Sequence, residues 1–469
     1  MQPIYKITMN SYLRTRIIFA LPFFMLGMLT ISTAVAQKKV NPTASEKQGD
    51  YHVAIQEFGN AEIEYMNVLS SGSIDIVSFD RVNIKLASTL YNVRRYSEAD
   101  KRFETVFIRN KKAFTPEYAT AYVSTLIRLK RFQRAIEVAE AFNDHPLFKV
   151  HKPLQNLKNG LEYQAKLPPS VPYKIKISSV NVPGSNYAVT HYGNGLMFVH
   201  HDNEEQSLIK GAQFYTYDGN ESSPYEKISH TLQAGPAAFD KVNNRILYTD
   251  NRYLGKGFVR ELKDQKYVTN LLRILELTYN TKTEMWEEPK DVFKDKNMFS
   301  TCHPTLTNND RRMYFSANFT DAVGGMDLYM CNRVGKGGWT KPIHLGNIVN
   351  TKDDEMYPLV YGDKLYFASN GLDGLGGMDI YSVELDSKGM PVSGSLKHLS
   401  YPINTIYNDF GFIHNNADDK GYFSSDRPEG RNLDTIYEWI EEEDVLPDNS
   451  LKQGAAITAR PNQNMVNQK

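Results

Sequence analysis

The C-terminal half of this chain contains near copies of one segment, and this repetition limits the fold more than any other feature. The first copy runs from His303 to Tyr329 and the second from Tyr357 to Tyr381. Each contains an aromatic residue followed by proline, a polar turn, a Tyr-Phe pair, and a glycine-rich loop that leads into Gly-Gly-Met-Asp. A looser third copy begins at Asn408. Repeats of this kind indicate similar supersecondary units packed side by side.

Each copy predicts three β-strands joined by a tight hairpin and a longer glycine loop. The Tyr-Phe pairs begin at Tyr314, Tyr366 and Tyr422, in short apolar runs rich in strand-forming residues. Asn, Asp or Gly precedes each run and tolerates the backbone angles of a tight turn. Residues 339–342 supply a fourth, outer strand after the first copy. Four short antiparallel strands per repeat are typical of a β-propeller blade.

Two weaker copies lie upstream, so the sequence predicts five blades. Their hairpins contain Phe198 and Tyr248, and the five copies recur every 50 to 66 residues, longer than the roughly 40–45 residues of a WD40 blade. A sixth blade would need the segment from Lys174 to Val182. The same segment could instead close the ring by pairing with the last blade. We therefore predict a propeller over residues 173–440 with five blades, and six as the alternative.

Residues 1–36 have the order of a signal peptide. Arg14 and Arg16 precede an apolar stretch over residues 17–31, and Ala-Val-Ala at residues 34–36 is a small-x-small cleavage site. We expect an exported, periplasmic protein whose mature chain starts at Gln37. The alternative is an uncleaved membrane anchor, which the apolar run fits less well because it is short of the roughly 20 residues that span a bilayer. We expect no transmembrane segment in the mature chain.

Residues 46–165 predict a repeating set of helices. Three aromatic-x-x-Ala marks begin at Phe58, Tyr96 and Phe132. Their spacing is close to the period of roughly 34 residues of tetratricopeptide repeats. The small alanine would let two helices approach, and the aromatic residue would fill the turn between them. The region resembles a tetratricopeptide-repeat solenoid, whose concave face holds a partner's segment. An unrelated helical-hairpin domain is the alternative.

The first helix of each predicted pair should line that concave face. We expect Asn83, Ala87 and Tyr122 to bind a protein there, because the opposite faces of their helices carry leucines at positions 86, 90 and 126. A semi-rigid, proline-rich linker over residues 166–172 separates the helices from the propeller. We therefore expect the helical part to fold alone and hold its own partner. Residues 441–469 are acidic, then polar, and predict a disordered tail.

Three stretches of the propeller region resemble a known repeat. They are NDFGF from Asn408, GYFSSDR from Gly421 and GLGGMDIY from Gly374. They are similar to the WD40-like (PD40, TolB-type) repeats of Bacteroidota envelope proteins. The order of signal peptide, tetratricopeptide repeats and propeller also resembles that group, which includes a type IX secretion component. The resemblance implies a location near the outer membrane and partners among other envelope proteins. Those relatives usually continue into carboxypeptidase-regulatory-like and OmpA-type domains, neither of which is in this sequence.

The sequence contains no catalytic motif that we can assign. G-x-S-x-G, H-E-x-x-H and the phosphate-binding loop are missing from it. The run His200-His201-Asp202 resembles metal ligands, but adjacent histidines on a strand point to opposite faces, one to the channel and one into the blade. The acidic residues 353–355, or Asp327 with Asp379, could bind calcium. Asp327 and Asp379 each follow a glycine loop and are expected to cap it. We therefore predict no catalytic residue, no cofactor and no metal site.

Charge and cysteine content set two further limits. Lys and Arg total 54, as do Asp and Glu, so no general basic field attracts nucleic acid. The two cysteines, Cys302 and Cys331, lie in one predicted blade. Export would favour a disulfide, whereas their positions on the first and third strands, which are not neighbours, favour buried free thiols. The sequence leaves this choice open.

Two classes of function fit these features. The first is a non-enzymatic protein–protein interaction scaffold of the cell envelope, as an accessory subunit of an outer-membrane or type IX secretion or gliding assembly. The second is a propeller enzyme or glycan-binding protein with its site in the central channel. An enzyme would need His, Asp, Glu or Arg to converge at the channel mouth, whereas the repeat strands mostly supply Tyr, Phe and Ser. The sequence therefore favours the scaffold.

Overall fold

The computed structural model describes residues 41–54, 57–167, 171–202, 212–228, 233–240, 243–250, 258–262, 265–269, 271–293, 299–307, 310–335, 338–415, 419–430 and 433–441. The predicted signal peptide, part of the proline-rich linker and residues 442–469 of the predicted tail lie outside these ranges. Within them, no helix combines the length and the apolar character that crossing a membrane requires.

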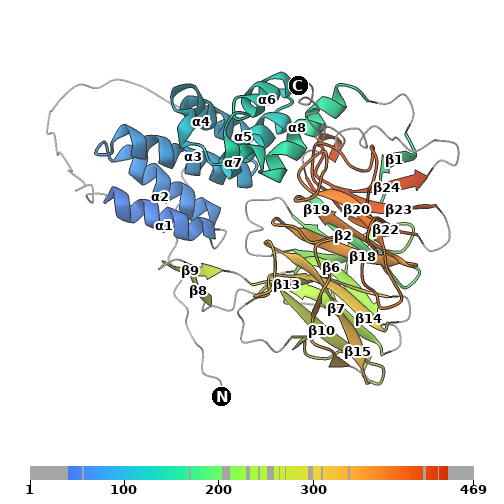
Figure 1. Ribbon diagram of the computed structural model, residues 1–469. Coiled ribbons are helices and arrows are strands. Elements are labelled where there is room, and N and C mark those ends of the chain that lie inside the picture. The colour runs from blue at the N-terminus through green and yellow to red at the C-terminus, as the bar shows by residue number, and fades with distance from the viewer. Residues whose placement is uncertain are drawn as a thin grey trace, which may run out of the picture. The chain divides into compact units, whose positions relative to one another are not determined.

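The first part of the described chain is helical, with eight α-helices (Figure 1). Their bounds are α1 Pro42–Ala54, α2 Phe58–Ser70, α3 Ile76–Asn92, α4 Tyr96–Arg109, α5 Pro116–Arg128, α6 Phe132–Glu140, α7 Pro146–Lys149 and α8 Lys152–Gln164.

The repeated aromatic-x-x-Ala marks coincide with helix starts. Helices α2, α4 and α6 begin at Phe58, Tyr96 and Phe132, and the alanine of each mark is fully buried. Side-chain caps begin three of the other helices, α3, α5 and α7. Asp75 accepts a hydrogen bond from the backbone N–H of Ser78 at the start of α3, and the Thr115 hydroxyl accepts one from the backbone N–H of Tyr118 at the start of α5. Local sequence therefore sets where these helices begin.

The second part of the chain forms five antiparallel sheets, each a propeller blade. Blade 1 contains β2 Ser185–Tyr192, β3 Gly195–His201, β4 Gln213–Tyr217 and β5 Ser222–Pro224; blade 2 contains β6 Gln233–Asp240, β7 Arg245–Asp250, β10 Arg273–Asn280, β11 Met285–Trp286 and β12 Lys290–Asp291. Blade 3 contains β13 Thr301–Leu306, β14 Arg312–Ala317, β15 Asp327–Val334, β16 Gly338–Trp339 and β17 Ile343–His344; blade 4 contains β18 Glu355–Tyr361, β19 Lys364–Ser369, β20 Asp379–Glu384 and β21 Lys397–His398. A separate hairpin joins β8 Phe258–Leu262 to β9 Gln265–Thr269.

Blade 5 closes the ring with a strand from the other end of the propeller. It contains β22 Asp409–His414, β23 Lys420–Ser425 and β24 Thr435–Glu441, and its outer strand is β1 Tyr173–Ile177. Ile175 lies opposite Trp439 in this antiparallel pair. The segment that could have begun a sixth blade therefore closes the fifth, and the propeller has five blades. Strand β24 also includes Glu441, which the sequence had assigned to the tail.

The Tyr-Phe pairs hold neighbouring blades together. Tyr366 and Phe367 are adjacent on β19 and so point to opposite faces of blade 4. Phe367 packs with Tyr314 and Leu328 of blade 3, whereas Tyr366 packs with Phe412 of blade 5. Both rings are buried, so each pair fills two interfaces between blades.

Both cysteines are free thiols inside blade 3. Cys302 on β13 pairs with Ser316, and Cys331 on β15 pairs with Met313, so the two lie on either side of β14. Burial raises the pKa of the Cys331 thiol to about 12, and it raises the pKa of Cys302 as well. Neither thiol is set up to react near neutral pH.

Candidate functional site

The acidic residues of the repeated motif stabilise the glycine loops. Asp327 accepts hydrogen bonds from the backbone N–H groups of Val323 and Gly324, at 2.7 and 3.1 Å. Asp379 accepts from the N–H of Leu375 and Gly376, at 2.8 and 2.9 Å. Both carboxylates are fully buried. They cap the loops as the sequence predicted.

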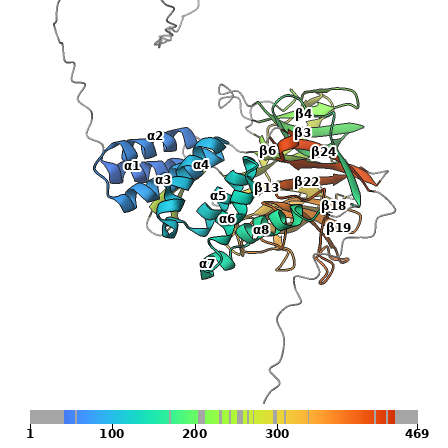
Figure 2. The ribbon, with the colours of Figure 1, turned by 90° about the horizontal axis from the view of Figure 1, so that it is seen from above.

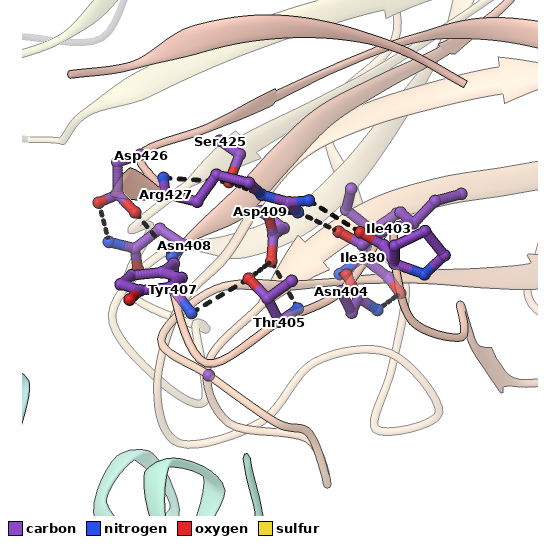
Figure 3. Close-up of polar contacts among 12 residues, drawn as sticks. Ile380, Ile403, Asn404, Thr405, Tyr407, Asn408, Asp409, Ser425, Asp426 and Arg427 are labelled. Carbon is purple, nitrogen blue, oxygen red and sulfur yellow. Dashed lines mark hydrogen bonds and ion pairs between the residues drawn. The ribbon is translucent and has the colours of Figure 1, made fainter. Parts of the chain in front are cut away.

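A buried arginine holds the start of blade 5 (Figure 3). The guanidinium of Arg427 donates to Asp409 at 2.5 Å, to the Ser425 hydroxyl at 2.8 Å and to the carbonyls of Pro402 and Ile403 at 2.9 and 2.8 Å. Arg427 is buried, with 4% of its surface exposed. An ion pair this deeply buried, with its donors satisfied, fixes the local geometry.

The equivalent acid in blade 4 lies in a different environment. Glu355 pairs with Ser369 as Asp409 pairs with Ser425, but glycine stands at position 371 where blade 5 has Arg427. Glu355 accepts hydrogen bonds from the Ser369 hydroxyl and from the backbone and hydroxyl of Thr351. Burial outweighs these bonds and raises the pKa of Glu355 to about 7.

Helix α5 reaches the same part of blade 5. Arg128 donates to the carboxylate of Asp426 and, at 2.5 Å, to its backbone carbonyl. Asn408 also donates to this carboxylate, from its backbone at 2.9 Å and its side chain at 2.7 Å. Burial acts to raise the pKa of Asp426, but Arg128 and the bonds from Asn408 hold it below its ordinary value. Arg128, at the end of α5, is 7% exposed, so this is a buried junction between helices and propeller.

A loop of the propeller is part of the helical core. Ile406 and Tyr407, which precede β22, belong to the apolar cluster that contains Leu126 and Leu157. The Arg128 guanidinium lies 5.1 Å from the centre of the Tyr407 ring. The helical face that meets this loop is the kind of surface on which we expected a partner's segment. In this protein, the chain's own propeller occupies it.

Helix α8 completes the junction at blade 4 (Figures 1 and 2). The Asn156 side chain donates to the carbonyl of Leu372 at 2.8 Å and accepts from the N–H of Gly374 at 3.0 Å. A Cβ at Gly160 would lie 1.7 Å from the carbonyl oxygen of Leu375. Helices and sheets form one compact unit from Asn41 onward. These contacts argue against a helical module that is structurally independent of the propeller.

The three predicted protein-binding residues lie inside the helical region. Asn83 is 4% exposed, and Ala87 and Tyr122 are fully buried. Asn83 accepts a hydrogen bond from Arg102 of α4, and the Tyr122 hydroxyl donates to Glu104 of α4. Their helices are covered on both sides, so the face opposite the leucines is also a packing face. The prediction that these residues form the binding surface is therefore wrong.

Each innermost strand contains an irregularity beside the channel. The register of the strand pairs shifts after Tyr187, Cys302, Met356 and Phe410, and also within β6. Four residues at these bulges have positive φ angles: Ala188 at 56°, His303 at 56°, Tyr357 at 54° and Gly411 at 62°. Such angles are costly for bulky residues and often mark functional positions. The bulges turn aromatic side chains toward the channel.

A cavity of about 480 Å³ opens at the channel mouth. Its lining residues are Arg94, Ser185, Tyr187, His201, Tyr357, Phe410 and Asp434. Arg94, on the turn after α3, pairs with Asp434 at 3.2 Å, and the Ser185 hydroxyl donates to the same carboxylate at 2.9 Å. The size lies within the range of roughly 300–1,000 Å³ that is usual for small-molecule sites.

The two adjacent histidines have the separate environments that the sequence predicted. His200 is buried in the blade, between Asn186 at 3.0 Å and Asp202 at 2.9 Å. His201 lines the cavity, where burial lowers its pKa. Among the described residues, no group of three or more His, Cys, Asp or Glu side chains is arranged to hold a metal ion.

Sequence reasoning missed the channel-mouth set. Arg94, Tyr187, Phe410 and Asp434 come from four distant segments. One signal was present: Tyr187 and Phe410 come just before the bulge residue, and Tyr357 is itself a bulge residue. An alignment of the inner strands would have placed these aromatic residues in two adjacent columns at the bulge.

Comparisons with known proteins give only weak similarity. No family model and no curated protein match the sequence. Among solved structures, a prolyl endopeptidase is similar over 57% of this chain and 40% of its own length, with 13% identity and a TM-score of 0.32. An exo-β-1,3-galactanase from Clostridium thermocellum is similar over 57% of this chain and 62% of its own length, with 10% identity and a TM-score of 0.39. An α-L-arabinofuranosidase from Lactobacillus brevis is similar over 55% of this chain and 89% of its own length, with 8% identity and a TM-score of 0.35. The similarity assigns no activity to this chain.

Proposed function

We propose that this protein is a non-enzymatic protein–protein interaction scaffold of the cell envelope. The observation that carries the proposal is the buried junction around Arg128 and Asp426, which makes two repeat arrays one body with a large, fixed surface. The motif carboxylates Asp327, Asp379 and Asp409 are fully buried, and each accepts a structural hydrogen bond. Their engagement supports binding rather than catalysis.

The resemblance to Bacteroidota envelope proteins supplies the rest of the proposal. In this proposal the helices are tetratricopeptide repeats, the chain is exported to the periplasm, and its partners are proteins of an outer-membrane or type IX secretion assembly. The buried alanines at the starts of α2, α4 and α6 support the repeat assignment. The equal numbers of acidic and basic residues are consistent with protein partners rather than nucleic acid.

The surface that we assign to a partner is the outer side of α2. The propeller loop already covers the helical face at α5 and α8, so a second protein must bind elsewhere. Ile63 and Met66 are 59% and 39% exposed and lie one helical turn apart. Contiguous exposed apolar surface is a common feature of binding sites.

Affinity purification from the native envelope tests this proposal. We expect the full chain to retain other envelope proteins, and the variant Ile63→Asp with Met66→Asp to lose at least one of them. Lys101→Asp, an exposed change on α4, is the control and should retain all of them. The circular dichroism spectrum should be the same for all three proteins. A wild-type chain that retains no envelope protein would contradict the proposal.

Export has a separate and direct test. The purified mature protein should begin at Gln37, because the small residues at positions 34–36 form the predicted cleavage site. N-terminal sequencing measures this. A chain that keeps Met1 and stays in the inner membrane would show that the segment is an anchor.

A further inference from the structure

The channel mouth presents an arc of aromatic rings from successive blades. The His303 ring stacks on Tyr357 at 3.9 Å between centroids and an angle of 15°. The ring centroids of Tyr357 and Phe410 lie 4.7 Å apart, and those of Phe410 and Tyr187 lie 6.4 Å apart. Tyr187, Tyr357 and Phe410 line the cavity. The blades thus bring two tyrosines and a largely buried phenylalanine, 8% exposed, to one opening.

The charges of the cavity are balanced within it. Among the described residues that line it, Arg94 is the one fixed cation and Asp434 the one fixed anion, and they pair at 3.2 Å. His201 contributes little charge near neutral pH, because burial lowers its pKa. A strongly anionic ligand would have to displace Asp434, and a cationic ligand would have to displace Arg94. The cavity therefore favours a ligand without net charge.

The polar groups that line the cavity include both hydrogen-bond donors and hydrogen-bond acceptors. The Arg94 guanidinium donates, the Asp434 carboxylate accepts, and the hydroxyls of Ser185, Tyr187 and Tyr357 do either. A planar guanidinium and a carboxylate can each contact two neighbouring oxygen atoms of a ligand. A ring with adjacent hydroxyl groups on its edge and C–H groups on its faces matches this combination of polar groups and aromatic faces.

We infer that the channel mouth is a binding site for a neutral carbohydrate of one or two sugar units. The sugar would pack against Tyr187, Tyr357 and the small exposed part of Phe410, and its hydroxyl groups would contact Arg94 and Asp434. Arg94 comes from the helical region and the other residues from the propeller. The site is therefore complete only while the buried junction at Arg128 holds the helices in place.

Saturation-transfer-difference NMR on the full chain tests this site. The neutral probes are maltose, cellobiose, lactose and chitobiose, and the anionic probes are glucose 6-phosphate and glucuronate. We expect at least one neutral disaccharide to show saturation of its ring protons, and the anionic sugars to show none. Arg94→Gln and Phe410→Leu should each weaken binding at least about tenfold, the effect of losing one good contact.

Arg95→Gln is the matched control for Arg94→Gln. Arg95 lies on the same turn but pairs with Glu62 and Glu98, away from the cavity. Its variant should bind the sugar as the wild type does. The inference is overturned if none of the neutral probes binds, if the anionic sugars bind more tightly, or if Arg94→Gln and Phe410→Leu, with wild-type melting temperatures, bind unchanged.

Discussion

Asp409 and Glu355 begin the inner strands of neighbouring blades, and their surroundings differ by one residue. Asp409 has Arg427 beside it, whereas Glu355 has no cation within ion-pair distance among the described residues. Burial raises the pKa of both acids, but only Asp409 has a cation beside it that compensates its charge. The difference leads to two predictions.

Replacement of Arg427 should destabilise the protein strongly. Arg427→Met leaves Asp409 as an uncompensated buried charge, so we expect a loss of about 3–5 kcal/mol in the free energy of unfolding. The double variant Arg427→Met with Asp409→Asn should recover part of this loss, because the buried charge is gone. Urea unfolding measures both. A single variant as stable as wild type would mean that the pair is not buried in solution.

Glu355 should make stability depend on pH. Between pH 4.5, near the ordinary value for glutamate, and pH 7, the unfolded chain has released a proton that the folded protein still holds. Stability from this group is therefore full below pH 4.5, falls as the pH rises, and reaches its minimum above pH 7. The total is roughly 3 kcal/mol.

The variant Glu355→Gln isolates this effect, because glutamine does not ionise. We expect the difference in the free energy of unfolding, Glu355→Gln minus wild type, to be larger at pH 8 than at pH 5. Urea unfolding of both proteins at each pH measures it. Glu384→Gln, at an exposed position on the same blade, should show no such change. A constant difference between Glu355→Gln and wild type would contradict the raised pKa of Glu355.

At the scale of elements, helix α8 and the glycine loop of blade 4 approach so closely that a single methyl group decides their fit. Gly160 lies against the carbonyl oxygen of Leu375, and the loop itself is held by Asp379. Glycine within a helix usually lowers stability relative to alanine. At position 160 an alanine side chain would not fit, because the two backbones meet at that point.

Two glycine-to-alanine variants should therefore change stability in opposite directions. Gly160→Ala forces α8 and the loop apart, and we expect a loss of roughly 1–3 kcal/mol. Gly59→Ala on α2 meets nothing within 4 Å, so it should gain up to about 1 kcal/mol. Thermal melting of both variants checks this. A stabilised Gly160→Ala protein would show that α8 does not pack on blade 4.

At the scale of the whole molecule, the buried junction joins helices and propeller into one body. Arg128 and Asp426 are separated by 298 residues, and Ile406 and Tyr407 complete the helical core. Loss of the propeller would expose that core to water. The two parts should therefore unfold together.

This coupling can be measured with two probes in the full chain. All three tryptophans, Trp286, Trp339 and Trp439, lie in propeller strands, so their fluorescence reports on the propeller. Circular dichroism at 222 nm reports mainly on the helices. We expect the same melting temperature from both, and Arg128→Met should lower both equally. A separate, earlier transition at 222 nm would show independent domains.

The sequence determined the repeating elements of this protein. Strand positions follow from alternating apolar runs and turn residues, and helix starts follow from caps and repeated marks, all of which act over a few residues. The five blades, the loop-capping role of Asp327 and Asp379 and the absence of a transmembrane helix in the described residues could be predicted in this way. The sequence left open whether Lys174 to Val182 starts a blade or closes the ring.

The tertiary structure decided what the repeats bury and what they leave accessible. Asn83, Ala87 and Tyr122 have the spacing of an exposed helical face, yet neighbouring helices cover them. The channel-mouth cavity and the contact of Tyr407 with the helices join residues that are far apart in the chain. No local pattern encodes such contacts, because they depend on how complete elements pack against one another.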